Sequence, residues 1–140
     1  MPRKDAGRRA ELVLVAEMRA TLRRLLRRTE ELAAEQGLTS QRYTLLLQIE
    51  ASPAGESTVG ELTEKLQLGQ TAVTEIVKRA VAADLIERRR SEEDARVSLL
   101  RLTPEGSRRM YAVFDALEAD RAVFLAAFAE LGKTVRAYRE

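Results

Sequence analysis

The sequence predicts a mainly α-helical protein with a small β wing, that is, a winged helix-turn-helix between long N- and C-terminal helices. Three observations indicate this fold class. Two short helical patterns meet at a tight turn, two short strand patterns around an acidic tip follow them, and apolar heptads run through both ends of the chain. At 140 residues, the chain is expected to form one domain with a helical extension.

The helix-turn-helix is predicted from capping and spacing. Thr58 and Glu61 form a capping box, which predicts a short helix over 59–67. Leu68 and Gly69 interrupt the pattern, and helical spacing resumes over 70–83. The second helix of such a pair can lie in the major groove of DNA. Its candidate DNA-binding residues are Gln70, Thr71, Thr74, Glu75, Lys78 and Arg79.

The hairpin is predicted over the next twenty residues. The first strand is expected over Ile86–Arg90 and the second over Arg96–Leu102, with a polar tip between them. Thr103, Pro104 and Glu105 then supply a capping hydroxyl, a proline suited to the first helical position and a carboxylate at the positive helix end. A helix is therefore expected to begin there.

The charge run of the hairpin has two interpretations. On an arbitrary hairpin, basic residues more often form a solvated strand face. Directly after a helix-turn-helix, they indicate a wing that contacts nucleic acid. The basic residues are Arg88, Arg89, Arg90, Arg96 and Arg101, and we take Arg88, Arg90 and Arg96, together with Asp94, as further DNA-binding candidates.

The most specific motif is DARVSLLRLTPEG, which ends a run of patterned segments from about Gly37 to Gly106. This run resembles the multiple-antibiotic-resistance-regulator (MarR) family of bacterial transcription factors, whose wing has DxR followed by LxLTxxG. The resemblance implies that Arg96 reaches the minor groove and that Asp94 orients it. A permanently charged, planar guanidinium held by a carboxylate suits a narrow, electronegative groove.

Three positions depart from the family pattern. Asp84 stands where the family commonly has glycine, and it tolerates left-handed backbone less easily. Ala80 replaces a common leucine, which predicts closer packing of this helix. Glu75 places a carboxylate on the groove face, where it would repel phosphate and could accept a hydrogen bond from cytosine N4. We therefore expect a distinct operator sequence.

Charge is distributed unevenly along the chain. The net charge is only +2, but residues 1–30 hold nine basic against four acidic residues and residues 78–109 hold nine against six. Because phosphate neutralisation is local, a modest total charge is compatible with a basic contact surface. Residues 1–10 form a basic N-terminal tail that is either solvated or tracks DNA, and the solvated tail is favoured.

Absent residue types exclude several chemistries. The chain has no histidine and no cysteine, so thiol chemistry, zinc binding and peroxide sensing are not expected, and we expect neither a cofactor, a metal nor an enzymatic activity. It also has no tryptophan, which argues against a urate-type pocket. No apolar stretch predicts a membrane span or secretory signal, so a cytoplasmic protein, on the nucleoid when bound to DNA, is expected.

Apolar heptads predict that residues 11–36 and 104–140 are dimerisation helices outside a DNA-binding lobe over 37–103. A long apolar seam needs a cover, and the resemblance implies that the terminal helices interlock into a homodimer. The symmetric dimer would present two recognition helices to a pseudo-palindromic operator. The dimerisation residues are expected to include Val15, Met18, Leu22, Phe124, Phe128 and Leu131.

A small organic ligand is a further possible partner. Tyr43, Tyr111 and Phe114 are candidates for an effector pocket, with Arg19 or Arg23 as anion partner, although core packing is the commoner role of each aromatic. The expected function is a homodimeric, sequence-specific transcriptional regulator, a repressor released by a phenolic effector if it has one. The alternative is a winged-helix scaffold that binds protein partners, or DNA without sequence specificity.

Overall fold

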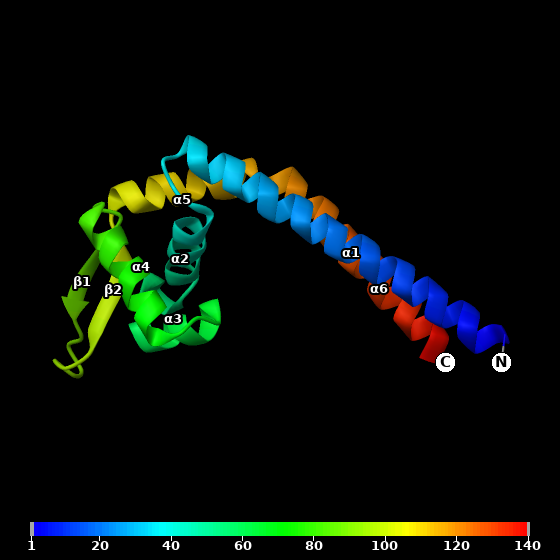
Figure 1. Ribbon diagram of the computed structural model, residues 1–140. Coiled ribbons are helices and arrows are strands. Elements are labelled where there is room, and N and C mark those ends of the chain that lie inside the picture. The colour runs from blue at the N-terminus through cyan, green and yellow to red at the C-terminus, as the bar shows by residue number, and fades with distance from the viewer. Residues whose placement is uncertain (1, 140) are drawn as a thin grey trace. The chain divides into compact units, whose positions relative to one another are not determined.

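The computed structural model describes residues 2–139, which fall into two units. The winged-helix lobe, Leu32–Asp115, is mainly helical with a two-stranded wing, as predicted (Figure 1). The terminal-helix unit holds the chain up to Glu31 and from Ala116 onward. In chain order the elements are α1 (Pro2–Glu35), α2 (Ser40–Glu50), the 3-10 turn η1 (Pro53–Gly55), α3 (Val59–Leu66), α4 (Gln70–Ala82), β1 (Ile86–Arg90), β2 (Ser98–Leu102), α5 (Pro104–Ala116) and α6 (Glu118–Arg139).

The predicted helix-turn-helix is confirmed as α3 and α4. The hydroxyl of Thr58 accepts the backbone N–H of Glu61 at 3.2 Å and caps α3. The carboxylate of Glu61 accepts from the hydroxyl of Ser57 at 3.2 Å, so only half of the expected capping box is present. The left-handed residue between the helices is Gln67, with φ of 53°, whereas Gly69 is extended and caps α4. Gly69 is therefore the N-cap residue of α4, and Gln67 supplies the left-handed residue of the turn.

The wing is an antiparallel hairpin in which Ile86 pairs with Leu102 and Arg90 with Ser98. β1 has the expected bounds, but β2 begins at Ser98 instead of the expected Arg96. The difference has a local cause. The backbone N–H of Val97, opposite Ser91, donates to the backbone carbonyl of Asp94 at 2.9 Å instead of to the facing strand, and Asp94 Oδ1 accepts the backbone N–H of Arg96 at 3.0 Å. Arg96 therefore lies in the tip of the wing.

The core of the lobe joins the helices to the base of the wing. Fully buried side chains come from α2, α3, α4, both strands and α5; they include Leu45, Leu46, Ile49, Leu62, Val73, Val77, Leu85, Ile86, Leu100, Met110 and Val113. Ala80 is also fully buried, consistent with the close packing expected of a small residue. α4 and the wing thus share one core, which fixes both within the lobe.

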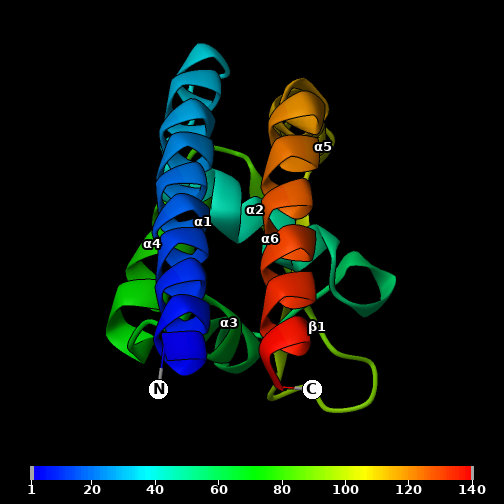
Figure 2. The same cartoon turned by 90° about the vertical axis from the view of Figure 1, so that its right-hand side faces the viewer.

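Two features of the terminal helices differ from the expectations. Residues 2–10, which the sequence separated as a tail, are helical and continue α1. The C-terminal heptads run without interruption through Leu117, yet the helix breaks there, between α5 and α6. α1 and α6 run side by side in the terminal-helix unit (Figure 2), where Arg28 Nε lies 4.0 Å from Asp120 Oδ2.

Candidate nucleic-acid interface

α4, the second helix of the helix-turn-helix, has one buried and one exposed face. Val73, Ile76, Val77 and Ala80 point into the core of the lobe. All six predicted DNA-binding side chains of this helix, Gln70, Thr71, Thr74, Glu75, Lys78 and Arg79, are exposed. The first four of them line a shallow depression. The face of α4 that the sequence predicted to bind DNA is therefore polar and solvent-accessible, and it has a shallow depression at its N-terminal end.

An ion pair lies on this exposed face. Arg79 Nε lies 3.3 Å from Glu75 Oε1, one helical turn away. Both side chains are more than half exposed, so the pair contributes little to stability and can exchange for other partners. Glu75 reduces the positive potential of the face, and it leaves a hydrogen-bond acceptor there.

The tip of the wing carries a guanidinium held by a carboxylate. Asp94 Oδ1 accepts both from the backbone N–H of Arg96 at 3.0 Å and from its Nε at 3.3 Å. The side chain of Arg96 is 91% exposed, so its remaining donors face solvent. This geometry is that of an oriented and accessible arginine, while its role toward DNA stays a prediction.

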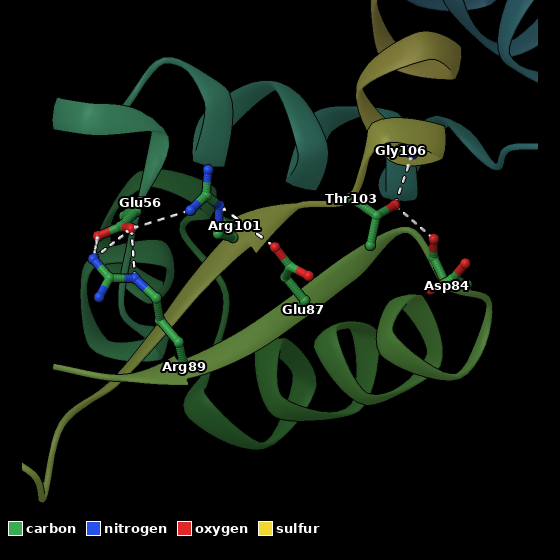
Figure 3. A network of polar contacts seen from close by, with 7 residues as sticks. All are labelled: Glu56, Asp84, Glu87, Arg89, Arg101, Thr103 and Gly106. Carbon is green, nitrogen blue, oxygen red and sulfur yellow. Dashed lines mark hydrogen bonds and ion pairs between the residues drawn. The ribbon is translucent and has the colours of Figure 1, made fainter.

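The other arginines of the wing divide into two groups. Arg88 and Arg90, both predicted DNA-binding residues, are exposed on β1. Arg89 and Arg101 instead contact Glu56, which precedes α3 (Figure 3). Glu56 was not predicted from the sequence. It lies in a short loop without periodicity, 33 residues from Arg89, so no local pattern indicates the contact.

The base of the wing is fixed by a threonine. The Thr103 hydroxyl donates to the backbone carbonyl of Asp84 at 2.7 Å and accepts the backbone N–H of Gly106 at 3.0 Å (Figure 3). It therefore caps α5 as predicted and also ties that helix to the end of α4. Asp84 has φ of 59°, the left-handed conformation expected where the family commonly has glycine.

The first turn of α5 contains a second charged cluster. The Glu105 carboxylate accepts hydrogen bonds from Arg108 at 2.6 Å and from Arg109 at 2.9 Å. These two guanidinium groups lower the pKa of Glu105 from 4.5 to about 2. The carboxylate also lies at the positive end of the helix, which favours its ionised form.

The candidate effector residues lie in both units. Tyr43 is buried in the lobe, whereas Tyr111 is largely exposed. Tyr111 packs edge-to-face against Phe114, with ring centroids 6.2 Å apart, and its hydroxyl donates to Glu50 at 3.4 Å. The negative charge of Glu50 raises the pKa of Tyr111. Arg19 and Arg23 are exposed on α1, in the terminal-helix unit. Their joint role remains a prediction.

The predicted dimerisation residues all lie in the terminal-helix unit. None is fully buried: Val15, Leu22 and Phe128 are exposed, and Met18, Phe124 and Leu131 are half-buried. Further apolar side chains that the heptads did not select are exposed as well, namely Leu12, Val13, Leu26, Val123 and Leu125. Apolar exposure in this unit is therefore broader than the predicted seam.

The part of the chain that the structure describes lacks two kinds of feature. No three histidine, cysteine or acidic side chains among residues 2–139 are grouped so as to hold a metal ion. Over the same range, no helix combines the length and the apolar character that crossing a bilayer requires.

Part of the chain matches a known protein family. Residues 36–97 match the model of the MarR family. No curated protein matches the chain as a whole. Among solved structures, a MarR-family transcription regulator superposes with a TM-score of 0.75 at 23% identity, with 95% of this chain and 93% of that chain covered.

Two further structures have the same fold. AbsC, a MarR-family transcriptional regulator from Streptomyces coelicolor, has a TM-score of 0.69 and 21% identity over 84% of this chain and 82% of its own. A mutant of E. coli MarR complexed with operator DNA has a TM-score of 0.64 and 22% identity over 86% and 80%, respectively. The chain therefore has the fold of these regulators, and its residues 36–97 match the MarR family model.

Proposed function

We propose that this protein is a sequence-specific DNA-binding repressor that acts as a homodimer on a pseudo-palindromic operator. One observation carries the proposal: a single lobe presents an exposed polar helix face, on α4, and an exposed arginine held by a carboxylate at the wing tip. An α-helix fits the major groove, and an arginine suits a narrow minor groove. The related E. coli MarR mutant is complexed with operator DNA, and we extend that type of partner to this chain.

The residues of α4 would read base edges and contact phosphates. Gln70, Thr71 and Thr74 line the depression at its N-terminal end, the part of a recognition helix that contacts bases. Glu75 would accept a hydrogen bond from cytosine N4. Arg79 would exchange its contact with Glu75 for a phosphate, because an exposed ion pair is weak and easily replaced.

The wing would supply the second set of contacts. Arg96 would enter the minor groove with its guanidinium oriented by Asp94, which limits the entropy lost on binding. Arg88 and Arg90 are exposed on β1, where they would contact phosphates. These contacts position the lobe on the duplex, while most base discrimination belongs to α4.

Homodimerisation would cover the apolar surface of the terminal-helix unit. Exposed large apolar side chains occur on both α1 and α6, and monomeric proteins rarely leave contiguous apolar surface of this kind in water. A second copy is the partner that the heptads favour. With two-fold symmetry, two lobes would meet two half-sites. A dimer seated on a promoter would exclude polymerase from that DNA, so we expect repression.

An amphipathic phenolic compound is the effector class we propose. The edge-to-face pair of Tyr111 and Phe114 offers an aromatic surface for stacking, and Arg19 and Arg23 are exposed cations. The compound would favour a dimer conformation in which both half-sites are no longer engaged together. A panel of small phenols that bind the folded dimer should raise its melting temperature.

Selection from a random-sequence duplex pool tests the main proposal. The protein should enrich a pseudo-palindrome and bind it more tightly than a scrambled duplex, at one stated salt concentration. Arg96→Ala should weaken binding to the selected duplex by about 1 to 3 kcal/mol, because a groove contact is lost.

Arg27→Ala is the matched control, since it removes one exposed arginine from α1. It should leave the affinity nearly unchanged. If no sequence is enriched and scrambled DNA binds equally well, the protein is instead a scaffold without sequence specificity. If Arg96→Ala behaves like Arg27→Ala, the wing assignment is wrong.

A further inference from the structure

Glu56 lies beside the wing as part of a third extended segment. Ser57 forms an isolated antiparallel bridge with Leu100, in which the two backbone N–H groups donate to the opposite carbonyls at 3.0 and 2.8 Å. β2 therefore has β1 on one side and the segment before α3 on the other. This register places Glu56 next to Arg101, which is itself opposite Glu87.

Arg89 reaches across β2 to Glu56. Its Nε and Nη2 donate to the two carboxylate oxygens of Glu56, both at 2.7 Å, in a bidentate arrangement (Figure 3). Because neighbouring strands lie about 4.8 Å apart, the side chain of Arg89 spans the width of two strand pairings. The Glu56 side chain is only 14% exposed, so this ion pair is better shielded from solvent than a typical surface pair.

The position of Arg89 gives the contact its mechanical importance. Arg89 is the fourth of the five residues of β1, close to the wing tip. Other anchors of the hairpin lie nearer its base, among them the buried pair Ile86 and Leu102 and the bridge to Leu100. A small rotation about these anchors would displace the tip, where Arg96 lies, by a larger distance.

We propose that Glu56 is a positioning residue for DNA binding, because its bidentate contact with Arg89 across β2 fixes the wing and thereby the place where Arg96 is presented. This inference rests on the proposed function. It predicts that removing Glu56 changes DNA affinity in the direction opposite to the one expected from charge. A carboxylate near DNA repels phosphate, so charge alone predicts that removing Glu56 strengthens binding. Positioning predicts that removing it weakens binding to the operator.

The test compares Glu56→Gln with Glu87→Gln in the full-length protein. Both substitutions remove one negative charge from the same network, but Glu87 pairs with Arg101 of the neighbouring strand, at 3.5 Å, so among the described residues this ion pair lies within the hairpin. Two quantities are measured: amide hydrogen exchange of the wing in the free protein, and affinity for the selected duplex and for a scrambled duplex.

The expected result is selective for Glu56→Gln. Its wing amides should exchange faster, and its affinity for the selected duplex should fall about tenfold, which is smaller than the largest losses expected for a direct groove contact. Its affinity for scrambled duplex should stay equal or rise, since one negative charge is gone. Glu87→Gln should retain wild-type exchange and operator affinity.

Arg89→Gln and the double variant complete the test. Arg89→Gln should lose at least as much operator affinity as Glu56→Gln, because it breaks the same contact and also removes a positive charge, and the double variant should lose no more than Arg89→Gln alone. Equal or tighter operator binding by Glu56→Gln would overturn the proposal. So would a loss confined to Arg89→Gln, which would mean that Arg89 itself contacts DNA.

Failure of the proposed function is a separate outcome. It appears as a wild-type protein that does not distinguish the selected from the scrambled duplex, which also removes the role of Glu56 in operator binding. Hydrogen exchange then decides whether the Glu56–Arg89 contact fixes the wing. Faster wing exchange in Glu56→Gln than in Glu87→Gln supports that part, and equal exchange overturns it.

Discussion

Gly106 allows the first turn of α5 to approach the end of α4 closely. A Cβ at this position would overlap the backbone carbonyl of Leu85, which cannot move independently of the wing base. Gly106→Ala should therefore lower the free energy of unfolding by about 1 to 3 kcal/mol, the usual cost of forcing extra atoms into a packed site. Urea denaturation followed by circular dichroism measures this change.

Gly60→Ala is the matched control in the same lobe. Gly60 lies in the first turn of α3, where an added Cβ would meet only the Thr58 hydroxyl oxygen, at an ordinary contact distance of 3.8 Å. Alanine there should stabilise the protein by up to about 1 kcal/mol, because it favours the helix more than glycine does. A destabilisation equal to that of Gly106→Ala would contradict this account.

Residues whose partners are close in sequence were predictable, and residues with distant partners were not. The contact between Asp94 and Arg96 spans two positions, and the cap from Thr103 to Gly106 spans three. Both follow from local motifs. Glu56 meets Arg89 across 33 positions, and that contact depends on the bridge that places two strands beside one another. Motifs and spacings within a short stretch of sequence cannot indicate such a bridge, because its two sides are far apart in the chain.

The start of helix α5 combines a cap with a charged cluster, and its stability should depend on pH. Glu105 has its pKa lowered from 4.5 to about 2. A carboxyl group with a lower pKa in the folded state stabilises the fold above its unfolded value and loses this effect as pH falls through the folded value. The melting-temperature advantage of wild type over Glu105→Gln should be full above pH 4.5 and decline toward pH 2.

Salt provides the control for this element. The ion pairs of Glu105 with Arg108 and Arg109 are partly exposed, so added salt should reduce the wild-type advantage at neutral pH. A difference between the two proteins that stays constant from pH 7 to pH 2 would exclude ionisation of Glu105 as its cause.

Element boundaries show where spacing alone is insufficient. Apolar heptads continue through Leu117, and neither proline nor glycine occurs there, yet α5 ends at Ala116 and α6 begins at Glu118. β2 likewise begins only at Ser98, because the backbone N–H of Val97 donates to the carbonyl of Asp94 within a turn. Periodicity identifies which residues share a face, but it does not determine where a helix or strand ends.

The whole molecule divides into a lobe with a packed core and a terminal-helix unit with exposed apolar side chains. The heptads predicted exposed apolar side chains in the terminal-helix unit, but more apolar side chains are exposed there than they predicted. Val123 and Leu125 are among its most exposed apolar residues, at 62% and 63%, and neither is one of the predicted dimerisation residues. A two-helix unit of one chain cannot bury apolar residues on all sides, so a dimer interface wider than one heptad seam is expected.

Phe128 tests the proposed homodimer. It is 48% exposed and packs edge-to-face on Phe124, with ring centroids 5.1 Å apart, so its outer surface is available to a second copy. In a two-fold dimer each substitution acts twice, and burying the exposed half of this side chain contributes about half of the 1.5 to 3 kcal/mol that full burial would give. Phe128→Ala should therefore raise the dimer dissociation constant at least about tenfold.

Analytical ultracentrifugation over a concentration series measures that constant, and Glu130→Gln, an exposed charge on the same helix, should leave it unchanged. The monomer formed by Phe128→Ala should keep a folded lobe, because Phe128 lies outside Leu32–Asp115. It should nevertheless bind a two-half-site duplex only as weakly as a single half-site, since one lobe contacts one half-site. An unchanged dissociation constant would mean that the second copy binds elsewhere.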